Sequence, residues 1–340
     1  MNNNLLQLPG FPAFTWSQDA LNPLLLNLKS KQEKILSNMD ALLPEYRNEV
    51  NKEVLVSEIY SILLSIGCSA EQYHIKDLVA NKLNHSLKGY IPETDKSLVS
   101  FIHLILEDAE NYKLELTKAR LIHWQDIVGQ IAAAQSNRST PFITEALEKQ
   151  LDRFLIWFNK PGLDRLMKAA IAHLWFQTIN PFKENGEILA GFISNIQLAK
   201  ADGTSFRYYS LPIQFKKEQH DYQFILAQTQ NGSLDITIWL QWFLGCLERA
   251  YDHSTILLSA IFIKANYWKH KTGIEFNKRQ KLIIQKLLEK EQLELTTTIY
   301  AQLVYCARDT ALRDVTDLMQ KQILTKEGGM GKNTRYKLIH

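Results

Sequence analysis

The chain has 340 residues, of which 46% are hydrophobic and 22% charged, a composition typical of a globular protein with room for two or three domains. Its net charge of +3 is too small to indicate a nucleic-acid-binding protein by itself. No apolar run approaches the roughly 18 residues of a membrane helix, no signal-peptide pattern opens the chain, and its three cysteines are scattered, so we expect a cytoplasmic protein without disulfides or a membrane partner.

Apolar residues at helical spacing predict a mainly α fold. Breaks at Asn159-Lys-Pro-Gly and Asn180-Pro181 separate helices, and a pair resembling a capping box, Thr144 and Glu148, opens one of them. In chain order, we expect helices at residues 17–45, 49–66, 95–111, 114–127, 143–159, 163–179, 187–201, 215–229 and 234–269.

The character of the sequence changes near residues 271–277. Three short helices are expected at 277–290, 297–305 and 308–321, followed at 323–339 by two β-prone arms around a glycine-rich tip. This order predicts a winged helix. Residues 308–337 hold seven Lys or Arg and four Asp or Glu, enough for phosphate contacts, although Asp309, Asp314 and Asp317 dilute the charge of the last helix. Winged helices also dock proteins. The DNA-binding candidates are Arg308, Thr310, Arg313, Lys332 and Arg335.

Between two expected helices lies the sequence NPFKENGEILAG, residues 180–191. A helix that begins directly after such a loop offers free N–H groups that favour an anion. The segment resembles the Fic signature HPFx[D/E]GNGRxxR, and the flanks AHLWFQTI and IQLAKADG support the match. The resemblance extends over nearly the whole chain. It implies an N-terminal Fic-associated region at 1–90, a Fic (Fido) core at 91–270 and a winged helix at 275–340.

Proteins of the Fic family transfer AMP from ATP to a protein hydroxyl. The motif histidine, which serves as the general base, falls here on Asn180, which has no group that titrates near neutral pH. The motif carboxylate that holds the metal is kept as Glu184. Both residues also have a structural interpretation, Asn180 as a turn residue and Glu184 as a solvated side chain.

The phosphate-binding part of the motif departs further. Its Gly-Asn-Gly falls on Asn185, Gly186 and Glu187, and its two arginines fall on Ile188 and Gly191. A loop that loses both cations and gains a carboxylate should repel a triphosphate unless Mg²⁺ intervenes. If the loop still binds a nucleotide or metal, we expect Glu184, Asn185, Gly186 and Glu187 to do so.

Two other elements of the resemblance also change. The segment LLSIGCSAEQ matches the inhibitory (S/T)xxxE(G/N) helix of the family, with Ile66 at the glutamate and Gly67 retained. Without the motif arginine, a glutamate at this position would carry an uncompensated charge, so the absence of both residues is physically consistent. The substrate-docking hairpin corresponds to IVGQIAAAQSNRSTPF, which is weakly β-prone, so we expect a reduced docking surface.

The leading hypothesis is a degenerate Fic-fold protein without AMP-transferase activity and without a cofactor. It would act as a regulatory or interaction protein, with an unknown protein partner and with DNA bound by the winged helix. The alternative is a divergent adenylyltransferase that uses ATP and Mg²⁺, Glu184 as metal ligand and another base such as His173, which can also be a core residue. A third hypothesis is a transcriptional regulator or antitoxin-like partner that senses a ligand. The resemblance leaves homodimer formation open.

Overall fold

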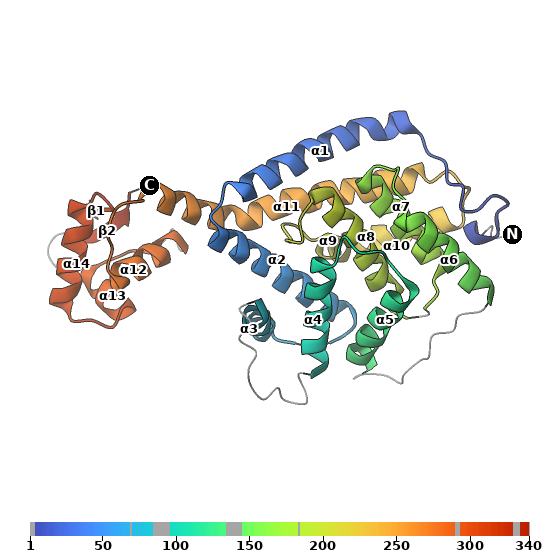
Figure 1. Cartoon of the computed structure of the whole chain (residues 1–340). Helices are drawn as coiled ribbons and strands as arrows, with labels where there is room; N and C mark the ends of the chain where they lie inside the picture. Colours follow the sequence, from blue (N-terminus) through green and yellow to red (C-terminus); the bar gives the residue numbers. More distant parts are fainter. Residues whose placement is uncertain are drawn as a thin grey trace. The chain divides into compact units, whose positions relative to one another are not determined.

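The computed structural model describes residues 4–68, 70–83, 96–133, 145–182, 184–289, 293–328 and 334–339 (Figure 1). The chain divides into two compact units. The first comprises Met1–Ala41 and Arg47–Ile256, and the second comprises Leu42–Tyr46 and Leu257–His340. None of the described helices is long and apolar enough to cross a membrane.

The first eleven α-helices follow a short 3₁₀ helix, η1 (Leu5–Gln7). In chain order they are α1 (Gln18–Asp40), α2 (Pro44–Ser65), α3 (Gln72–Leu83), α4 (Lys96–Glu110), α5 (Lys118–Ala133), α6 (Glu145–Asn159), α7 (Arg165–Ile179), α8 (Gly186–Asp202), α9 (Leu211–Lys217), α10 (Gln219–Gln230) and α11 (Thr237–His270).

These helices confirm the mainly α prediction, with four differences. Helix α5 runs to Ala133, beyond the helix expected at 114–127, so the first residues of the expected docking hairpin are helical. Pro44 starts α2 instead of continuing α1, because a proline at the first helical position loses no intrahelical hydrogen bond. Helix α3 was not predicted, although its buried Ile75 and Val79 are four residues apart. The helix expected at 215–229 is two helices, with Glu218 between them. Thr144, of the expected capping box, lies outside the described residues.

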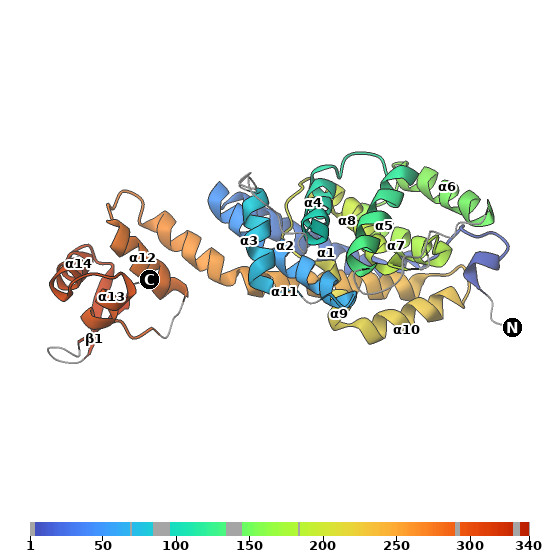
Figure 2. The same cartoon turned by 90° about the horizontal axis from the view of Figure 1, so that it is seen from below.

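Helices α7 and α8 form the centre of the first unit, and nearly all of their side chains are buried. Helix α7 begins at Asp164, whose carboxylate accepts hydrogen bonds from the backbone N–H of Leu166 (3.0 Å) and Met167 (3.3 Å). Helices α4 and α5 lie against α8 (Figure 2). The ring of Phe192 on α8 packs edge-on against Trp124 on α5, with centroids 5.5 Å apart.

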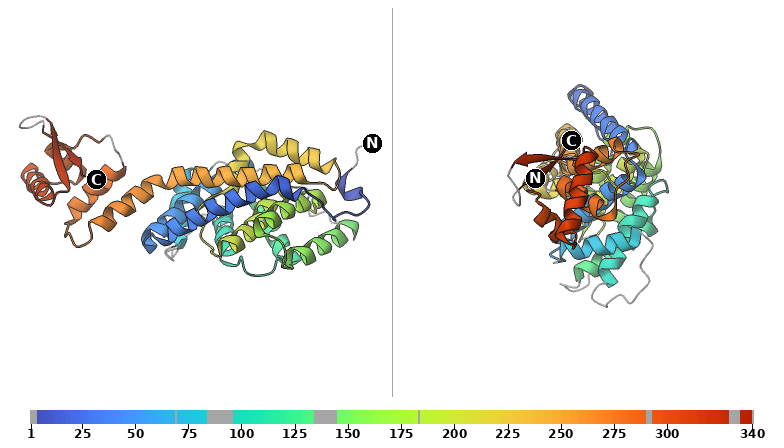
Figure 3. Two further views of the ribbon diagram at one scale, coloured as in Figure 1. Left: turned by 90° about the horizontal axis from the view of Figure 1, so that it is seen from above. Right: turned by 90° about the vertical axis from the view of Figure 1, so that its left-hand side faces the viewer.

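Helix α1 runs along the first part of α11 (Figure 3). Lys31 Nζ lies 2.7 Å from a carboxylate oxygen of Asp252 and 2.9 Å from one of Glu248. Asn27 donates a further hydrogen bond of 2.6 Å to Glu248. The first helix of the chain is therefore fixed to the last helix of this unit by polar contacts at its surface.

After the end of α11, the described part of the second unit has three helices and two strands in the predicted order. Strands β1 and β2 are antiparallel, with Leu324 opposite Leu338, and Leu295 forms an isolated bridge to Tyr336. The core joins Ile283 and Ile284 to side chains of the later elements. The tip of the predicted hairpin, 329–333, lies outside the described residues. The elements are α12 (Lys278–Glu289), α13 (Thr297–Leu303), α14 (Arg308–Gln320), β1 (Leu324–Gly328) and β2 (Arg335–Leu338).

Candidate functional site

Asn180 ends α7 in a left-handed backbone conformation, with φ of 41°. Its N–H donates to the Phe176 carbonyl at 2.8 Å, which closes the last helical turn. Pro181 is buried, and Phe182 is 1% exposed and packs against Phe176. The residues after Asn180 are therefore held by the core, while the Asn180 side chain itself is exposed.

Helix α8 begins at Gly186, directly after Asn185, which is also left-handed with φ of 61°. The Asn185 side chain makes no capping hydrogen bond to the helix. A Cβ atom on Gly186 would lie 3.0 Å from Oδ1 of Asn180, so the amide of Asn180 lies over the start of α8. Glu184 is exposed beside it. The loop thus presents a neutral amide and one carboxylate at a helix N-terminus.

A small pocket of about 40 Å³ opens beside the first two turns of α8. It is bounded by α2, α8 and α9, and its wall at α8 includes Ile188 and Gly191, where the motif arginines would stand. A Cβ atom on Gly191 would meet no other atom within 4 Å. Ile188 therefore presents an apolar side chain to the pocket, and Gly191 leaves open space there. The lining residues are Ser61, Ile62, Ser65, Glu187, Ile188, Gly191, Phe192, Pro212, Phe215 and Lys216.

The charges at this pocket come from Glu187 and Lys216. Surrounding protein atoms desolvate the Glu187 carboxyl and raise its pKa, although the side chain keeps an exposed surface, and the positive charge of Lys216 opposes this rise. Lys216 Nζ also lies 3.3 Å from Oε1 of Gln219. The pocket therefore holds one carboxylate and one ammonium group instead of a pair of guanidinium groups.

The segment that resembles the inhibitory helix does lie beside α8. Ser61, Ile62 and Ser65 belong to the last turns of α2 and face Gly191 across the pocket. Ile66, at the position of the inhibitory glutamate, packs against the hydrophobic core. The structure thus brings together the two segments that the resemblance pairs, without either of the charges expected there. The segment 134–142, which includes most of the expected docking hairpin, lies outside the described residues.

His173 lies inside the core of the first unit and is 0% exposed. Its Nδ1 lies 3.2 Å from Oγ of Ser194, its Nε2 lies 2.9 Å from the hydroxyl of Tyr222, and its ring stacks on Trp239. Burial lowers the pKa of His173 to about 3, so the imidazole is neutral at physiological pH. With both nitrogens already in contact with core side chains, it has no path to a substrate at the loop.

Glu184 has no neighbours that would complete a metal site. Within the described ranges, no group of three or more His, Cys, Asp or Glu side chains is placed to hold a metal ion. Glu184 and Glu187 are the acidic residues of the loop and of the first turn of α8. A cation bound at Glu184 would therefore depend on ligands from water or from another molecule.

The DNA-binding candidates fall on α14 and β2. Arg308 and Arg313 are exposed, and Thr310 is half-buried. Over the part of the chain that is described, no ion pair or hydrogen bond holds either of these two guanidinium groups. Arg335 Nη1 lies 2.5 Å from a carboxylate oxygen of Glu294. Lys332 lies outside the described residues.

Asp314, one of the three aspartates on α14, is buried in the unit, which corrects the expectation that it dilutes the charge of the exposed surface. Asp314 is buried and accepts hydrogen bonds from Arg279 (2.7 Å), Asn277 (2.8 Å) and Tyr300 (3.1 Å). Burial alone would raise the pKa of Asp314, but these hydrogen bonds outweigh it and hold the pKa below its usual range.

The carboxylate of Asp317 also accepts hydrogen bonds from neighbouring side chains. Lys321 Nζ and Gln280 Nε2 each lie 2.6 Å from Oδ2 of Asp317, and these hydrogen bonds lower its pKa. Lys321 is therefore paired within its own unit. The Asp317 side chain leaves 41% of its surface exposed, but its charge is paired with that of Lys321; among the described residues of α14, Asp309 is the acidic side chain without a charged partner.

Sequence reasoning did not identify Ser61, Ser65 or Lys216 as residues of the site. They lie more than 20 residues from the loop on either side, and no motif includes Lys216. The match of LLSIGCSAEQ to the inhibitory helix was the one signal that placed α2 near α8, and it pointed to Ile66 and Gly67 rather than to the pocket-lining serines.

Comparison with known proteins shows which solved structures share this arrangement of helices. No protein-family model matches the sequence, and no curated protein matches it significantly. Among solved structures, a Fic family protein from Desulfovibrio desulfuricans G20 is similar over 96% of this chain and 98% of that chain, with a TM-score of 0.52 and 14% identity.

Two further structures are similar at lower scores. They are a Fic domain containing signaling protein from Bacteroides thetaiotaomicron (TM-score 0.49, 17% identity, 73% of this chain and 100% of that chain) and Fic-1 from C. elegans (0.46, 15%, 70% and 73%). The full-length match to the Desulfovibrio protein carries the assignment, and the chain has the Fic fold.

Proposed function

We propose that this chain is a regulatory Fic-fold protein that lacks AMP-transferase activity and binds DNA through its second unit, which we interpret as a winged helix. The observation that carries the proposal is the orientation of α14. Its exposed side presents Arg308 and Arg313, while Asp314 is buried in the unit and Asp317 is paired with Lys321.

The lack of transferase activity follows from the chemistry of the loop. Asn180 offers no titratable group at the position of the general base, and His173 is buried, neutral and already hydrogen-bonded. Ile188 and Gly191 supply no cation to a phosphate, and Glu187 adds a carboxylate beside Glu184. These residues do not fit a magnesium-bound triphosphate.

Incubation of the purified protein with labelled ATP, Mg²⁺ or Mn²⁺ and a cell lysate tests this part of the proposal. We expect no label on the protein or on any lysate component. Label transfer that Glu184→Ala abolishes would establish the alternative, an adenylyltransferase that transfers AMP to a protein hydroxyl. Transfer that persists in Glu184→Ala would instead point to a contaminating enzyme.

DNA binding is supported by charge and by geometry. Two uncommitted guanidinium groups on one exposed helix can bind phosphates or base edges. Arg335 can join them if a phosphate displaces Glu294, an exchange between exposed partners that involves little free energy. A helix held in place by its buried side, with a cationic exposed side, is the arrangement with which helix-turn-helix proteins enter the major groove.

Measurement of binding to the DNA upstream of the chain's own gene, across a series of salt concentrations, tests this part. We expect affinity to fall with salt, and Arg313→Ala to weaken binding by about 1–3 kcal/mol if the residue contacts a base. Lys34→Ala, which removes the same charge from exposed α1 in the first unit, is the matched control and should bind like the wild type. Absence of any complex at low salt would contradict DNA binding.

A second candidate, ligand sensing by the first unit, is favoured by the pocket beside α8. The pocket itself has a volume of about 40 Å³, so a nucleotide could place only part of its structure there, beside Glu187 and Lys216. Calorimetry with ATP, GTP, CDP-choline and UTP tests it. Gly191→Leu is the matched variant, because a side chain at this position enters open space and should block the pocket without disturbing the helix. No heat with any of these ligands at millimolar concentration would remove nucleotides as the sensed class.

A further inference from the structure

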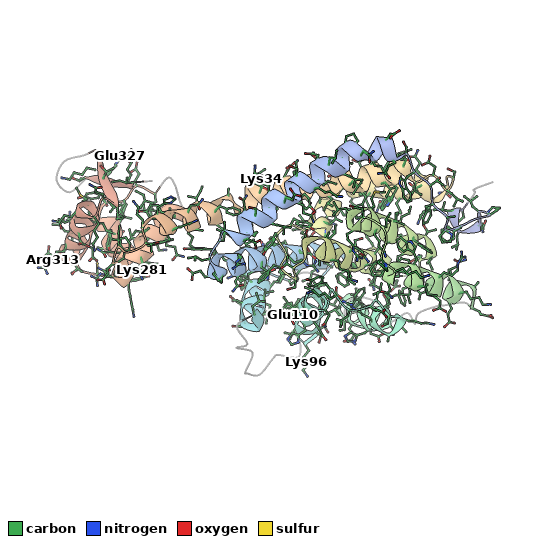
Figure 4. The ribbon with its side chains drawn as sticks, turned by 45° about the horizontal axis from the view of Figure 1, so that its top comes forward. Lys34, Lys96, Glu110, Lys281, Arg313 and Glu327 are labelled. Atoms are coloured by element: carbon green, nitrogen blue, oxygen red, sulfur yellow. The ribbon has the colours of Figure 1, made fainter. Side chains whose placement is uncertain are left out.

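On one side of α14, four exposed side chains precede the exposed Gln320 of the last turn. They follow one another at intervals of three, one and three residues, which is the spacing of a single face of an α-helix. The opposite side of the helix is buried in the core of the unit through Ala311, Val315 and Leu318. Arg313 lies at the edge of this unit in Figure 4. The four exposed residues, which we call the outer face, are Asp309, Leu312, Arg313 and Thr316.

Two members of the outer face offer apolar groups. Leu312 leaves 51% of its surface exposed, although its neighbours along the face are polar. Thr316 lies one turn further along, and its hydroxyl donates to the Leu312 carbonyl at 2.8 Å. Because that hydrogen is used within the helix, the methyl group of Thr316 remains for an external contact. The apolar group on a base edge in the major groove is the 5-methyl of thymine, which aliphatic side chains and threonine methyls contact.

The other two members offer complementary polar groups. The uncommitted guanidinium of Arg313 matches the O6 and N7 acceptors of guanine, the base that arginine binds with two hydrogen bonds. The carboxylate of Asp309 would be repelled by phosphates and by those same guanine acceptors. It can accept a hydrogen bond from the amino group of cytosine. The outer face therefore carries groups that discriminate between bases, in addition to positive charge.

A protein partner fits this face less well. Leu312 is its one large apolar side chain, whereas a stable protein interface buries about 800 Å² on each partner. With Asp314 buried and Asp317 paired with Lys321, the exposed surface of α14 holds Arg308 and Arg313 against Asp309, a small positive charge that favours an anionic partner.

We propose that the outer face of α14 reads a mixed major-groove sequence, in which Leu312 and Thr316 contact a thymine methyl group and Arg313 binds a neighbouring guanine. This inference rests on the DNA binding proposed above and adds which bases are read and by which side chains. Discrimination between base sequences would then come from the outer face of α14, and Arg308 would add electrostatic attraction to the DNA phosphates.

The experiment uses the full-length protein to select duplexes from a random pool at low salt. The selected duplex is then synthesised with deoxyuridine in place of each thymidine, and with 7-deazaguanine in place of each guanine, one position at a time. One deoxyuridine should weaken wild-type binding about fourfold, the effect of one lost methyl contact, and should leave the double variant Leu312→Ala/Thr316→Ser unaffected. One 7-deazaguanine should weaken the wild type about fivefold or more and leave Arg313→Ala unaffected.

Leu282→Ala is the matched control, because Leu282 is another exposed leucine of the same unit, on α12. It should respond to both analogues as the wild type does. Binding without base preference, or a deoxyuridine effect that persists in Leu312→Ala/Thr316→Ser, would overturn this inference and leave DNA binding intact. Failure to bind any duplex at low salt would contradict the proposed function itself. Both substituted leucines are exposed, so loss of folding is not expected to obscure the result.

Discussion

The buried imidazole of His173 makes the stability of the first unit depend on pH. In the folded chain, burial lowers the pKa of His173 to about 3, against an ordinary value of 6.5. The unfolded chain therefore binds a proton at a pH where the folded chain does not. The contribution to stability is complete above pH 6.5 and is lost as the pH falls from 6.5 toward 3.

The size of this effect follows from the two pKa values. Between pH 7 and pH 5, protonation of the unfolded chain should lower the free energy of unfolding by about 2 kcal/mol. The result changes little with the folded pKa as long as that value stays well below 5. His173→Gln removes the titrating group, so this part of the pH dependence should disappear. The variant should also be less stable at pH 7, by about 1–3 kcal/mol, because Tyr222 and Ser194 lose well-placed partners.

Urea unfolding at pH 7 and pH 5, followed by tryptophan fluorescence, measures the effect. Of the seven tryptophans, all except Trp268 lie in the first unit, so the signal reports this unit. His220→Gln is the control, since His220 is exposed at the start of α10. It should keep the wild-type difference between the two pH values. An equal difference in wild type and His173→Gln would refute the reasoning, because His173 would then not be buried in its neutral form.

Other predictions concern the ends of helices and the fixation of α14. Gly203→Ala should destabilise the first unit by about 1 kcal/mol, because the backbone φ is +71° there, although no neighbouring atom would obstruct a Cβ. Gly129→Ala, within α5, should instead stabilise the unit by about 0.5–1 kcal/mol. Thermal denaturation of both variants measures the two changes. Asp164→Ala should lower the free energy of unfolding by about 1–2 kcal/mol, because α7 loses its N-terminal cap. Lys29→Ala removes only the ion pair with Asp164 and should lower it by less than about 0.5 kcal/mol. Equal losses for the two variants in urea unfolding would contradict the capping role. Asp314→Asn should speed amide hydrogen exchange in α14, and unchanged exchange would show that its hydrogen bonds do not hold this helix.

Much of the fold was predictable because helical periodicity and strong breaks coincide in this sequence. Asn180-Pro181 and the Ala-Asp-Gly stop at 201–203 bound α8 closely, since left-handed residues end both α7 and α8. Helix α3 was missed because it is short and its apolar residues occupy a narrow stripe. The break at Pro44 was missed because the apolar pattern continues through Leu42 and Leu43, which outweighed the proline.

The candidate site was less predictable. Position-by-position comparison identified Asn180, Ile188 and Gly191, but it could not show that Gly191 opens onto a pocket, because the facing wall comes from α2, more than a hundred residues earlier. Charge counting treated Asp314 and Asp317 as surface residues. The burial of Asp314 and the hydrogen bond from Gln280 to Asp317 depend on residues of α12 and α13, which no local pattern reveals.

In α14, the residues that stabilise the position of the helix are different from the residues that are exposed for binding. Residues that hold the helix in place, Asp314 with Arg279, Asn277 and Tyr300, lie on its inner side, and residues available to a ligand lie on its outer side. Substitutions on the outer side can therefore accumulate without threatening the fold, so relatives of this chain could diverge in specificity while sharing one scaffold. The same separation makes the helix a practical starting point for engineering new specificities by exchanging its outer residues as a set.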